Sequence, residues 1–340
     1  MEGVAAGVPA DGRRNDQHTL RMEIRYVTHT AIDDRKWDAC IRRSVNSRLY
    51  AYSWYLNLVC ERWDALVDGD YEQVFPLPVR RKAGMAYVYT PPFVQQLGLF
   101  SPGHITPGLV HAFLKAIPSQ FKVVDLRLNT LNKVSDSWGA LLHRNYELSL
   151  IGDYERIRSV FSENLRRSLR KAEIAGMERI SGLSPAELIR LFRENRGRGI
   201  STLGEREYQI LERLAHAMMH RGLGQIVAAT AGGNRILAGA LIAEMPGQSI
   251  FLFSATERRE NNHGALAWLI DLYLREHAGT QRVFDFEGSD DEGLGRFYAG
   301  FGAQETNYPG LRLNRLPLLL RPLPGLFRET VAFRHKLGLP

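Results

Sequence analysis

The sequence predicts an α/β (α+β) protein made of two similar domains, each a mixed, twisted sheet flanked by helices. Two short apolar runs, 249–255 and 282–287, are typical of buried strands, and the residues between them are apolar at helical spacing. A connection of this length favours parallel strands and a right-handed crossover. The same order of strand, loop, helix and strand occurs between residues 86 and 128. We therefore expect the same fold to occur twice.

Composition supports two domains and narrows the partners. The chain has 340 residues, of which 44% are hydrophobic, which is enough for about two cores. The net charge of +7 favours anionic partners such as coenzyme A, RNA or phospholipid. Cys40 and Cys60 lie in apolar, helix-like surroundings, which favours free thiols in a reducing compartment. We expect a cytoplasmic protein without a transmembrane segment, because no apolar run approaches about 20 residues.

The chain begins with a segment, 1–20, whose Gly, Ala, Asp and Arg content predicts a disordered tail. The first domain is expected at 21–146. Its expected strands are near 21–28, 63–67, 72–80, 86–89 and 123–128, and its expected helices are near 33–44, 53–62 and 108–116. Pro118 separates the last helix from the last strand.

A stretch rich in aromatic and amide side chains lies around the loop that follows strand 86–89. It contains Tyr87, Tyr89, Gln95 and Gln96. Two interpretations stay open: these side chains contact an acceptor substrate, or they pack between the domains. Packing is the favoured one.

The second domain is expected at 147–314. Its expected elements are a strand at 147–150, a basic helix at 154–175, helices at 184–195 and 205–221, and a strand meander at 224–230, 236–244 and 249–255. Ser184 and Glu187 form a capping-box pattern with proline at the first helical position. The crossover helix, the strand 282–287 and an aromatic helix complete the domain.

A polar loop, 259–264, precedes the crossover helix. Free backbone N–H groups and the helix dipole at such a position favour an anion, for example a pyrophosphate. The candidate residues for binding the donor are Arg259, Asn262, His263, Gly264 and Ala265. A polar loop ahead of an amphipathic helix is also common without any ligand.

Three segments carry a family resemblance. Arg259 and Gly264 match the acyl-donor motif Gln/Arg-x-x-Gly-x-Gly/Ala of the GNAT acyltransferase superfamily, with Asn262 where a glycine is usual. The run 297–303 resembles the superfamily's FY-x-x-x-G helix end. The segment 164–173, NLRRSLRKAE, resembles the N-x-R-R-x-x-R-K-A pattern of the FemAB-like and BioF2-like acetyltransferases.

The resemblance implies tandem GNAT-like domains of which the second is catalytic. It implies an N-acyltransferase that moves an acetyl or other acyl group from coenzyme A to an amine, with Tyr298 as the acid for the leaving group. The first domain would then have lost donor binding and would shape the acceptor site. The FemAB-like pattern leaves open an aminoacyl-tRNA donor and a cell-wall precursor as acceptor. A third possibility is a non-catalytic module that binds RNA or an anionic membrane.

Two carboxylates, Asp285 and Glu287, alternate with Phe284 and Phe286 on the expected strand and should share one face. A carboxylate on a buried strand is costly unless it is paired or functional. Either one is a candidate base for the amine proton or a group that orients the amine. The structural alternative is a salt bridge to Arg282 or Arg296.

Basic residues dominate one face of the expected helix 154–175. These residues are Arg166, Arg167, Arg170 and Lys171. They are candidates for contact with phosphate groups of the substrate or donor, although a solvated face is the usual explanation of such a run. The C-terminal tail, 315–340, is basic and rich in Leu and Pro. Packing is favoured there over contact with a membrane surface.

Other chemistries lack their motifs. The chain has no C-x-x-C, no H-E-x-x-H, no phosphate-binding G-x-x-x-x-G-K-[ST] and no G-x-S-x-G. His216 and His220 are one helical turn apart without an acidic or cysteine partner, so no metal is expected.

Overall fold

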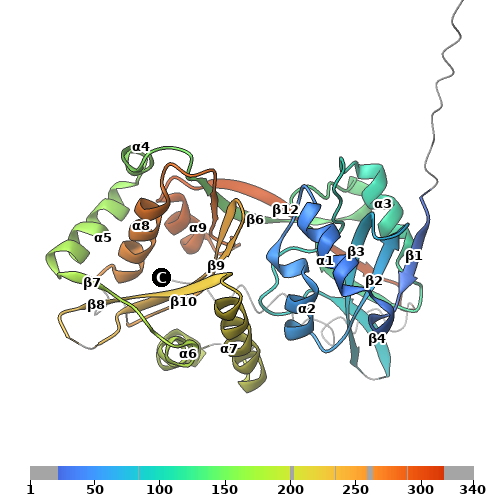
Figure 1. The fold of residues 1–340 in the computed structure, drawn as a ribbon, viewed down its shortest axis with the longest axis horizontal. Coiled ribbons are helices and arrows are strands. Elements are labelled where there is room, and N and C mark those ends of the chain that lie inside the picture. Colours follow the sequence, from blue (N-terminus) through green and yellow to red (C-terminus); the bar gives the residue numbers. More distant parts are fainter. Residues whose placement is uncertain are drawn as a thin grey trace, which may run out of the picture.

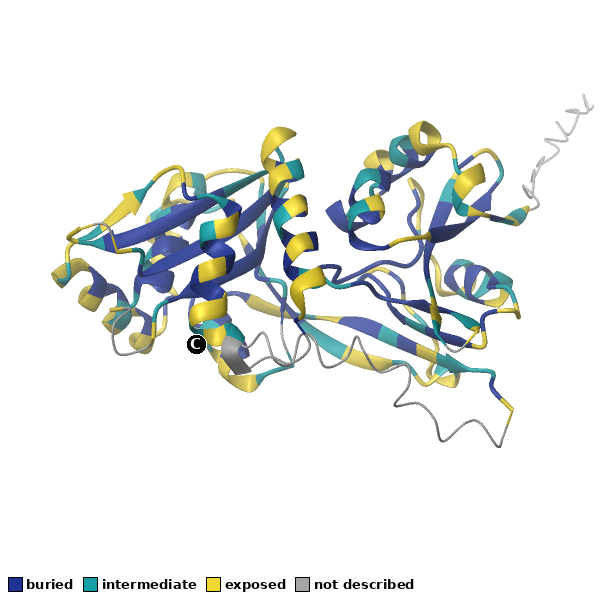
Figure 2. Cartoon of the chain, turned by 90° about the horizontal axis from the view of Figure 1, so that it is seen from below, coloured by how far each residue is buried: buried dark blue, intermediate teal, exposed yellow. Residues whose placement is uncertain are grey.

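A computed structural model describes residues 22–82, 84–199, 203–233, 235–258, 263–288 and 290–317. Within these residues the strands form one sheet of twelve, in the order β1-β2-β3-β4-β5-β12-β6-β11-β10-β9-β8-β7. Figure 1 shows two halves side by side with β12 running from one to the other. The strands form the buried centre of each half, and the helices keep exposed outer faces (Figure 2).

The N-terminal half contains the first five strands. They are β1 Ile24–Val27, β2 Trp63–Asp68, β3 Gln73–Lys82, β4 Met85–Tyr89 and β5 Val123–Arg127. Its helices are α1 Asp34–Arg43, α2 Ser53–Val59 and α3 Pro107–Ala116, with short 3₁₀ turns η1 His29–Ala31, η2 Leu49–Ala51 and η3 Asp136–Trp138. The apolar residues of α1 and α2 belong to one core and those of α3 to another, so the helices cover opposite faces. β4 and β5 are parallel, as expected around a crossover helix.

The C-terminal half contains the remaining strands and helices. They are β6 Leu141–Ser149, α4 Tyr154–Ser159, α5 Glu163–Ile174, β7 Met177–Ile180, α6 Pro185–Glu194, η4 Arg196–Gly199, α7 Glu205–His220, β8 Gly224–Ala231, β9 Ala238–Met245, β10 Gln248–Thr256, α8 Ala265–His277, β11 Val283–Asp285, α9 Glu292–Ala299 and β12 Gln304–Asn314. Helices α5, α8 and α9 cover one face, and α6 and α7 cover the other (Figure 1).

The predicted crossover unit is confirmed. α8 joins β10 to β11, and these two strands are parallel. The capping box at the start of α6 is also present, with both of its hydrogen bonds. The mixed sheet flanked by helices in each half agrees with the predicted fold class, and the two sheets are continuous.

The prediction of one basic helix at 154–175 is wrong. The chain forms α4 and α5 instead, separated at residues 160–162. The first helix ends at Ser159, and Ser162 caps the second, because its Oγ accepts the backbone N–H of Leu165 at 3.3 Å. The backbone N–H of Ser162 donates to the Gly300 carbonyl at 2.8 Å, which fixes the bend against the end of α9.

Three strands differ from the expectation. β6 begins at Leu141, six residues earlier than expected, and β7 and β12 were not expected at all. β12 pairs with β6 through Gln304–Gly310 and with β5 through Gly310–Asn314, so it joins the halves. A Cβ on Gly310 would lie 2.4 Å from the His143 Nε2, which explains a glycine at this crossing.

The predicted domain limits stay predictions, and the limit after residue 146 falls inside β6. The tail 1–20 and residues 318–340 lie outside the described part. Arg315 donates to the carbonyls of Ile117 and Pro118 at 3.2 and 3.1 Å, and Leu316 is buried, so the start of the expected C-terminal tail packs on the N-terminal half. No helix in the described ranges has both the length and the apolar character needed to cross a membrane.

Candidate active site

The sheet opens between β10 and β11. These strands pair only through Gln248–Ile250 and Val283–Asp285, after which β10 continues to Thr256 with a bulge between Phe251 and Phe253. In the chain, α8 follows this same carboxyl end of β10. Ligands in open α/β sheets usually bind outside the carboxyl ends of parallel strands. The opening is therefore the candidate binding site.

Asp285 lies at the last position of β11 and is 1% exposed. Its carboxylate accepts from Arg48 Nη1 at 3.2 Å, from Gln248 Nε2 at 3.1 Å and from the Glu287 backbone N–H at 2.8 Å. Burial raises the pKa of Asp285 from 3.8 to about 6, Arg48 opposes this rise, and the charge of Glu147 adds to it. A buried carboxylate with these partners is tolerated because each of its oxygens is hydrogen-bonded.

Arg48 comes from the N-terminal half, directly before η2, and its side chain is 11% exposed. Its second guanidinium nitrogen, Nη2, lies 3.4 Å from the Glu147 Oε1. The guanidinium therefore bridges two carboxylates of the other half. Planar arginine is suited to this geometry because its donors form a rigid fork.

A row of amides continues this network into the N-terminal half. Asn145 Nδ2 donates to Glu147 Oε1 at 3.2 Å, Gln95 Nε2 donates to Asn145 Oδ1 at 2.9 Å, and Gln96 Nε2 donates to Gln95 Oε1 at 2.9 Å. Both glutamines are fully buried. Their amides thus contribute to packing between the halves, and acceptor contact stays a prediction.

Glu287 lies two residues beyond Asp285 and is partly exposed. Its φ is 57°, in the left-handed region, so the alternation expected for a strand does not extend to it. Tyr50 donates its hydroxyl to the Glu287 Oε1. Both carboxylates nevertheless meet the same short segment of the N-terminal half, Asp285 through Arg48 and Glu287 through Tyr50. Neither is paired with Arg282 or Arg296 in the contacts described.

Tyr298 lies in α9 and is 4% exposed. Its ring centroid is 4.9 Å from that of Phe286 and 5.9 Å from that of Tyr146. This packing places Tyr298 in the core that includes α8 and α9. Its role as an acid stays a prediction.

The start of α8 is in close contact with α5. Gly264 has φ of 80°, and a Cβ at this position would lie 2.6 Å from the Ser168 carbonyl oxygen. Ala265, the first residue of α8, is fully buried, and His263 has φ of 47°. Arg259 and Asn262 lie outside the described residues. Gly264 immediately precedes α8, and the first backbone N–H groups of a helix have no partner within the helix.

Ser254 is the other polar group at this opening. It lies on β10 beyond the last pair with β11 and is 1% exposed. Its neighbours Phe253 and Ala255 belong to the core under α6, so Ser254 points to the face that α8 covers. Among the described residues its Oγ has no hydrogen-bond partner. A polar ligand group would satisfy this hydroxyl.

The basic side chains of α5 face solvent. Arg166 donates to the Ser159 carbonyl at 2.7 Å, Arg167 to the Asn164 side chain, and Arg170 to Glu163 at 3.3 Å. Lys171 is exposed as well. These four residues lie on the helix that packs against α8, outside the carboxylate network.

Tyr87 and Tyr89 are buried in the N-terminal half, with ring centroids 5.9 Å apart. The Arg80 guanidinium lies 5.1 Å from the Tyr89 ring centroid. Burial raises the pKa of the Tyr89 hydroxyl. These contacts explain both residues as core, and contact with an acceptor stays a prediction.

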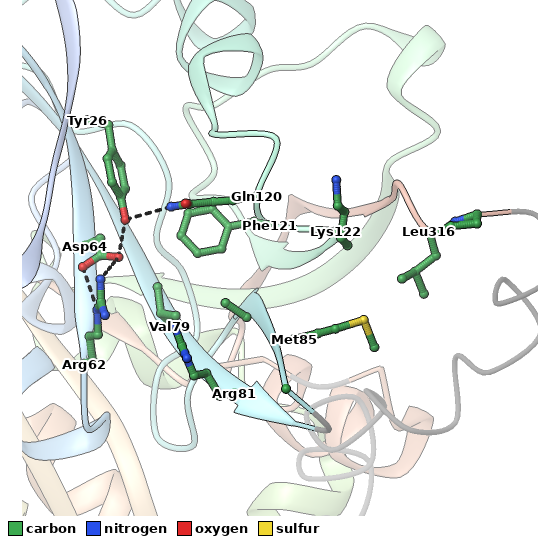
Figure 3. Close-up of a pocket in the computed structure, with 13 residues that line it drawn as sticks. Tyr26, Arg62, Asp64, Val79, Arg81, Met85, Gln120, Phe121, Lys122 and Leu316 are labelled. Carbon is green, nitrogen blue, oxygen red and sulfur yellow. Dashed lines mark hydrogen bonds and ion pairs between the residues drawn. The ribbon is translucent and has the colours of Figure 1, made fainter.

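A separate cavity of about 520 Å³ lies in the N-terminal half (Figure 3). Its carboxylate, Asp64, is held by the Tyr26 hydroxyl at 2.5 Å and by Arg62 at 3.0 Å. Burial, followed by the bond to Asp64, raises the pKa of Tyr26 to about 12. No residue of the network around Asp285 lines this cavity, so we place the candidate chemistry elsewhere.

Arg48, Tyr50, Asn145, Glu147 and Gln248 were not singled out by sequence. Arg48 is separated from Asp285 by 237 positions, so no local pattern reports their contact. The one signal was a lone arginine beside the apolar Leu49 and Tyr50. No group of three or more metal-ligating side chains occurs in the portion of the chain that the structure describes.

Comparison with known proteins agrees with the fold. Residues 159–297 match the family described as "Acetyltransferase (GNAT) domain". The solved structure of FemX is similar to the chain with a TM-score of 0.60 and 14% identity, covering 91% of this chain and 100% of FemX. L-PGS from Bacillus licheniformis has a TM-score of 0.50 and 12% identity, covering 87% of this chain and 96% of its own. A conserved protein of unknown function from Bacteroides thetaiotaomicron has a TM-score of 0.54 and 10% identity, covering 82% and 98%.

At such identities the likeness to solved structures establishes the fold. A sequence search of the curated proteins found no match.

Proposed function

From the match of residues 159–297 to the GNAT acetyltransferase domain and the fold shared with FemX, we propose that the chain is an N-acyltransferase of the GNAT superfamily, in its FemAB-like group. The acyl group, acetyl or a larger one, passes from a coenzyme A thioester to an amine. The observation that supports this most is that β11 ends at Asp285, where its pairing with β10 stops, and that α8 follows the same end of β10 in the chain.

The donor's phosphates bind at the α8 N-terminus, where free N–H groups and the helix dipole favour an anion. Gly264 is needed there because its φ is positive and its Cα lies against Ser168. Ser254 Oγ hydrogen-bonds the part of the donor that enters the opening. Arg259, Asn262, His263 and Ala265 belong to the same donor site.

Glu287 is the base, because it is the more exposed of the two carboxylates. It takes a proton from the amine, whose nitrogen attacks the thioester carbonyl carbon. The tetrahedral oxyanion is stabilised by backbone N–H groups of β10 beyond Ile250, where β11 no longer pairs. Collapse breaks the carbon–sulfur bond, and Tyr298 protonates the thiolate. Asp285 holds the Glu287 backbone through its hydrogen bond of 2.8 Å.

A second candidate donor is aminoacyl-tRNA, with the amine of a cell-wall precursor as acceptor. The exposed basic side chains of α5, Arg166, Arg167, Arg170 and Lys171, favour it, because several of them can contact phosphates at once. The cytoplasm, which holds both kinds of donor, is the proposed location.

Calorimetry with acetyl-coenzyme A at two salt concentrations tests the donor. We expect micromolar binding with a shallow salt dependence, lost in Gly264→Glu and retained in Gly279→Glu, which lies beyond the other end of α8. Failure of the intact protein to bind acetyl-coenzyme A would contradict this donor. Binding of aminoacyl-tRNA with a steep salt dependence would then favour the second candidate. RNA or membrane binding without acyl transfer from either donor would identify a module that only binds.

A further inference from the structure

Arg48 crosses from the N-terminal half to the carboxylates of the C-terminal half. Its Nη1 lies 3.2 Å from Asp285 Oδ2 and its Nη2 lies 3.4 Å from Glu147 Oε1. The Asp285 side chain is 1% exposed and that of Arg48 is 11% exposed. Removing one partner of an ion pair buried to this extent strongly destabilises the folded protein, because the other charge is left buried without compensation.

The other groups around Asp285 bring hydrogen bonds or further negative charge. Gln248 on β10 and the backbone N–H of Glu287 donate to it. Glu147 on β6 adds a second carboxylate, which Asn145 holds at 3.2 Å. Glu287 adds a third and is held by Tyr50. Arg48 is the cation in the described contacts of Asp285, so it supplies the charge that balances this group.

Asp285 in turn fixes the backbone at Glu287. Its Oδ1 accepts the backbone N–H of Glu287 at 2.8 Å, and the φ of Glu287 is 57°. A glutamate in the left-handed region of backbone conformation is unfavourable unless its surroundings hold it there. An ionised acceptor makes a stronger hydrogen bond to an N–H than a neutral one. The charge on Asp285 therefore bears directly on the geometry of Glu287.

We propose that Arg48 is a positioning residue: the N-terminal half uses it to keep Asp285 ionised, and ionised Asp285 holds Glu287 in place for proton transfer. This inference rests on the proposed function of Glu287 as the base. It means that the N-terminal half is part of the active site. An arginine is required because one guanidinium spans two carboxylates, which a lysine ammonium cannot do in the same fork geometry.

The test is a carboxyl titration of the folded protein by ¹³C NMR, with the Asp285 signal assigned from its loss in Asp285→Asn. Removal of a neighbouring cation raises a carboxyl pKa by about 1–3 units. We expect this rise in Arg48→Gln, a smaller rise in Arg48→Lys, and none in Arg35→Gln, whose side chain is exposed on α1. An unchanged Asp285 titration in folded Arg48→Gln would overturn the proposal.

A parallel readout is the pH dependence of kcat/KM for acyl transfer. The acidic limb should move to higher pH in Arg48→Gln by the same number of units, with a smaller shift in Arg48→Lys. A limb that stays in place while the Asp285 pKa moves would reject the positioning role. If Arg48→Gln does not fold, Arg48→Lys carries both measurements.

The titration needs no substrate, so the two proposals fail separately. If the Asp285 pKa rises in Arg48→Gln but the wild type transfers no acyl group, the proposed function is refuted. If the wild type transfers acyl groups but the Asp285 pKa does not change in Arg48→Gln, only the role of Arg48 is refuted.

Discussion

At Glu287 the backbone is in a conformation that non-glycine residues rarely adopt, with φ of 57°. Such a residue costs on the order of 1–3 kcal/mol and persists where its surroundings hold it. Here Asp285 holds its backbone and Tyr50 its carboxylate. This arrangement presents one partly exposed carboxylate at the opening of the sheet.

Replacing Glu287 should therefore affect catalysis far more than stability. We expect Glu287→Gln to lower kcat/KM for acyl transfer by about 10²–10⁴-fold, because the amide cannot accept the amine proton. Glu292→Gln on the exposed surface of α9 is the control, since its only described ion pair is with Arg296. Equal activities of the two variants in steady-state kinetics would exclude Glu287 as the base.

Asp285 should give the protein a recognisable dependence of stability on pH. Its pKa is raised to about 6 in the folded state, so the folded state holds this proton more tightly than the unfolded state. Its contribution to the free energy of unfolding is full at low pH and is lost as pH rises from about 4 to about 6. Urea denaturation should show this decline in the wild type relative to Asp285→Asn. A difference between them that is constant over this range would be inconsistent with the raised pKa.

At the scale of elements, the contact of α8 with α5 depends on Gly264. A Cβ there would lie 2.6 Å from the backbone carbonyl oxygen of Ser168. Neither atom can move without a shift of the backbone. Gly279, after the same helix, also has a positive φ of 77° but has nothing within 4 Å of its Cβ position.

These two glycines form a matched pair. Each change to alanine costs about 1 kcal/mol for the left-handed backbone, and Gly264→Ala should cost about 1–3 kcal/mol more because α8 and α5 must move apart. Chemical denaturation measures both, and calorimetry with the donor should show weaker binding for Gly264→Ala alone. Equal losses of stability would mean that the close approach is not important.

Some elements could be predicted from the sequence and others could not. Alternation and helical spacing predicted β10, α8 and β11, because their burial follows simple periods. The break at Ser162 was missed because the basic run reads through it, while the cap there depends on Gly300, far along the chain. β12 was missed because Gln304–Gly310 is polar and contains Pro309, and only pairing on both sides makes it a strand.

The candidate site follows the same rule. Asp285 and Glu287 could be selected from sequence because charges on an apolar strand are unusual. Arg48 and Tyr50 could not, because their contacts with these carboxylates span 237 residues in sequence. Asp285 was expected to pair, if at all, with a nearby arginine, and its partner instead comes from the other half.

At the scale of the whole molecule, β12 makes one sheet of both halves, and the pairs Arg48–Asp285 and Gln95–Asn145 join them again. Shared strands and buried ion pairs couple the stabilities of the parts they join. We expect scanning calorimetry to show a single unfolding transition, with equal calorimetric and van't Hoff enthalpies. Two separate transitions would show that the halves unfold independently.

The most direct test of the proposed function is amine-dependent release of free thiol from acetyl-coenzyme A, with the acylated amine identified by mass spectrometry across a panel of amines. We expect release by the wild type and by Glu292→Gln, and its loss in Glu287→Gln and Gly264→Glu. Release that persists in Glu287→Gln would exclude Glu287 as the base, and transfer that occurs only from aminoacyl-tRNA would exclude coenzyme A as the donor.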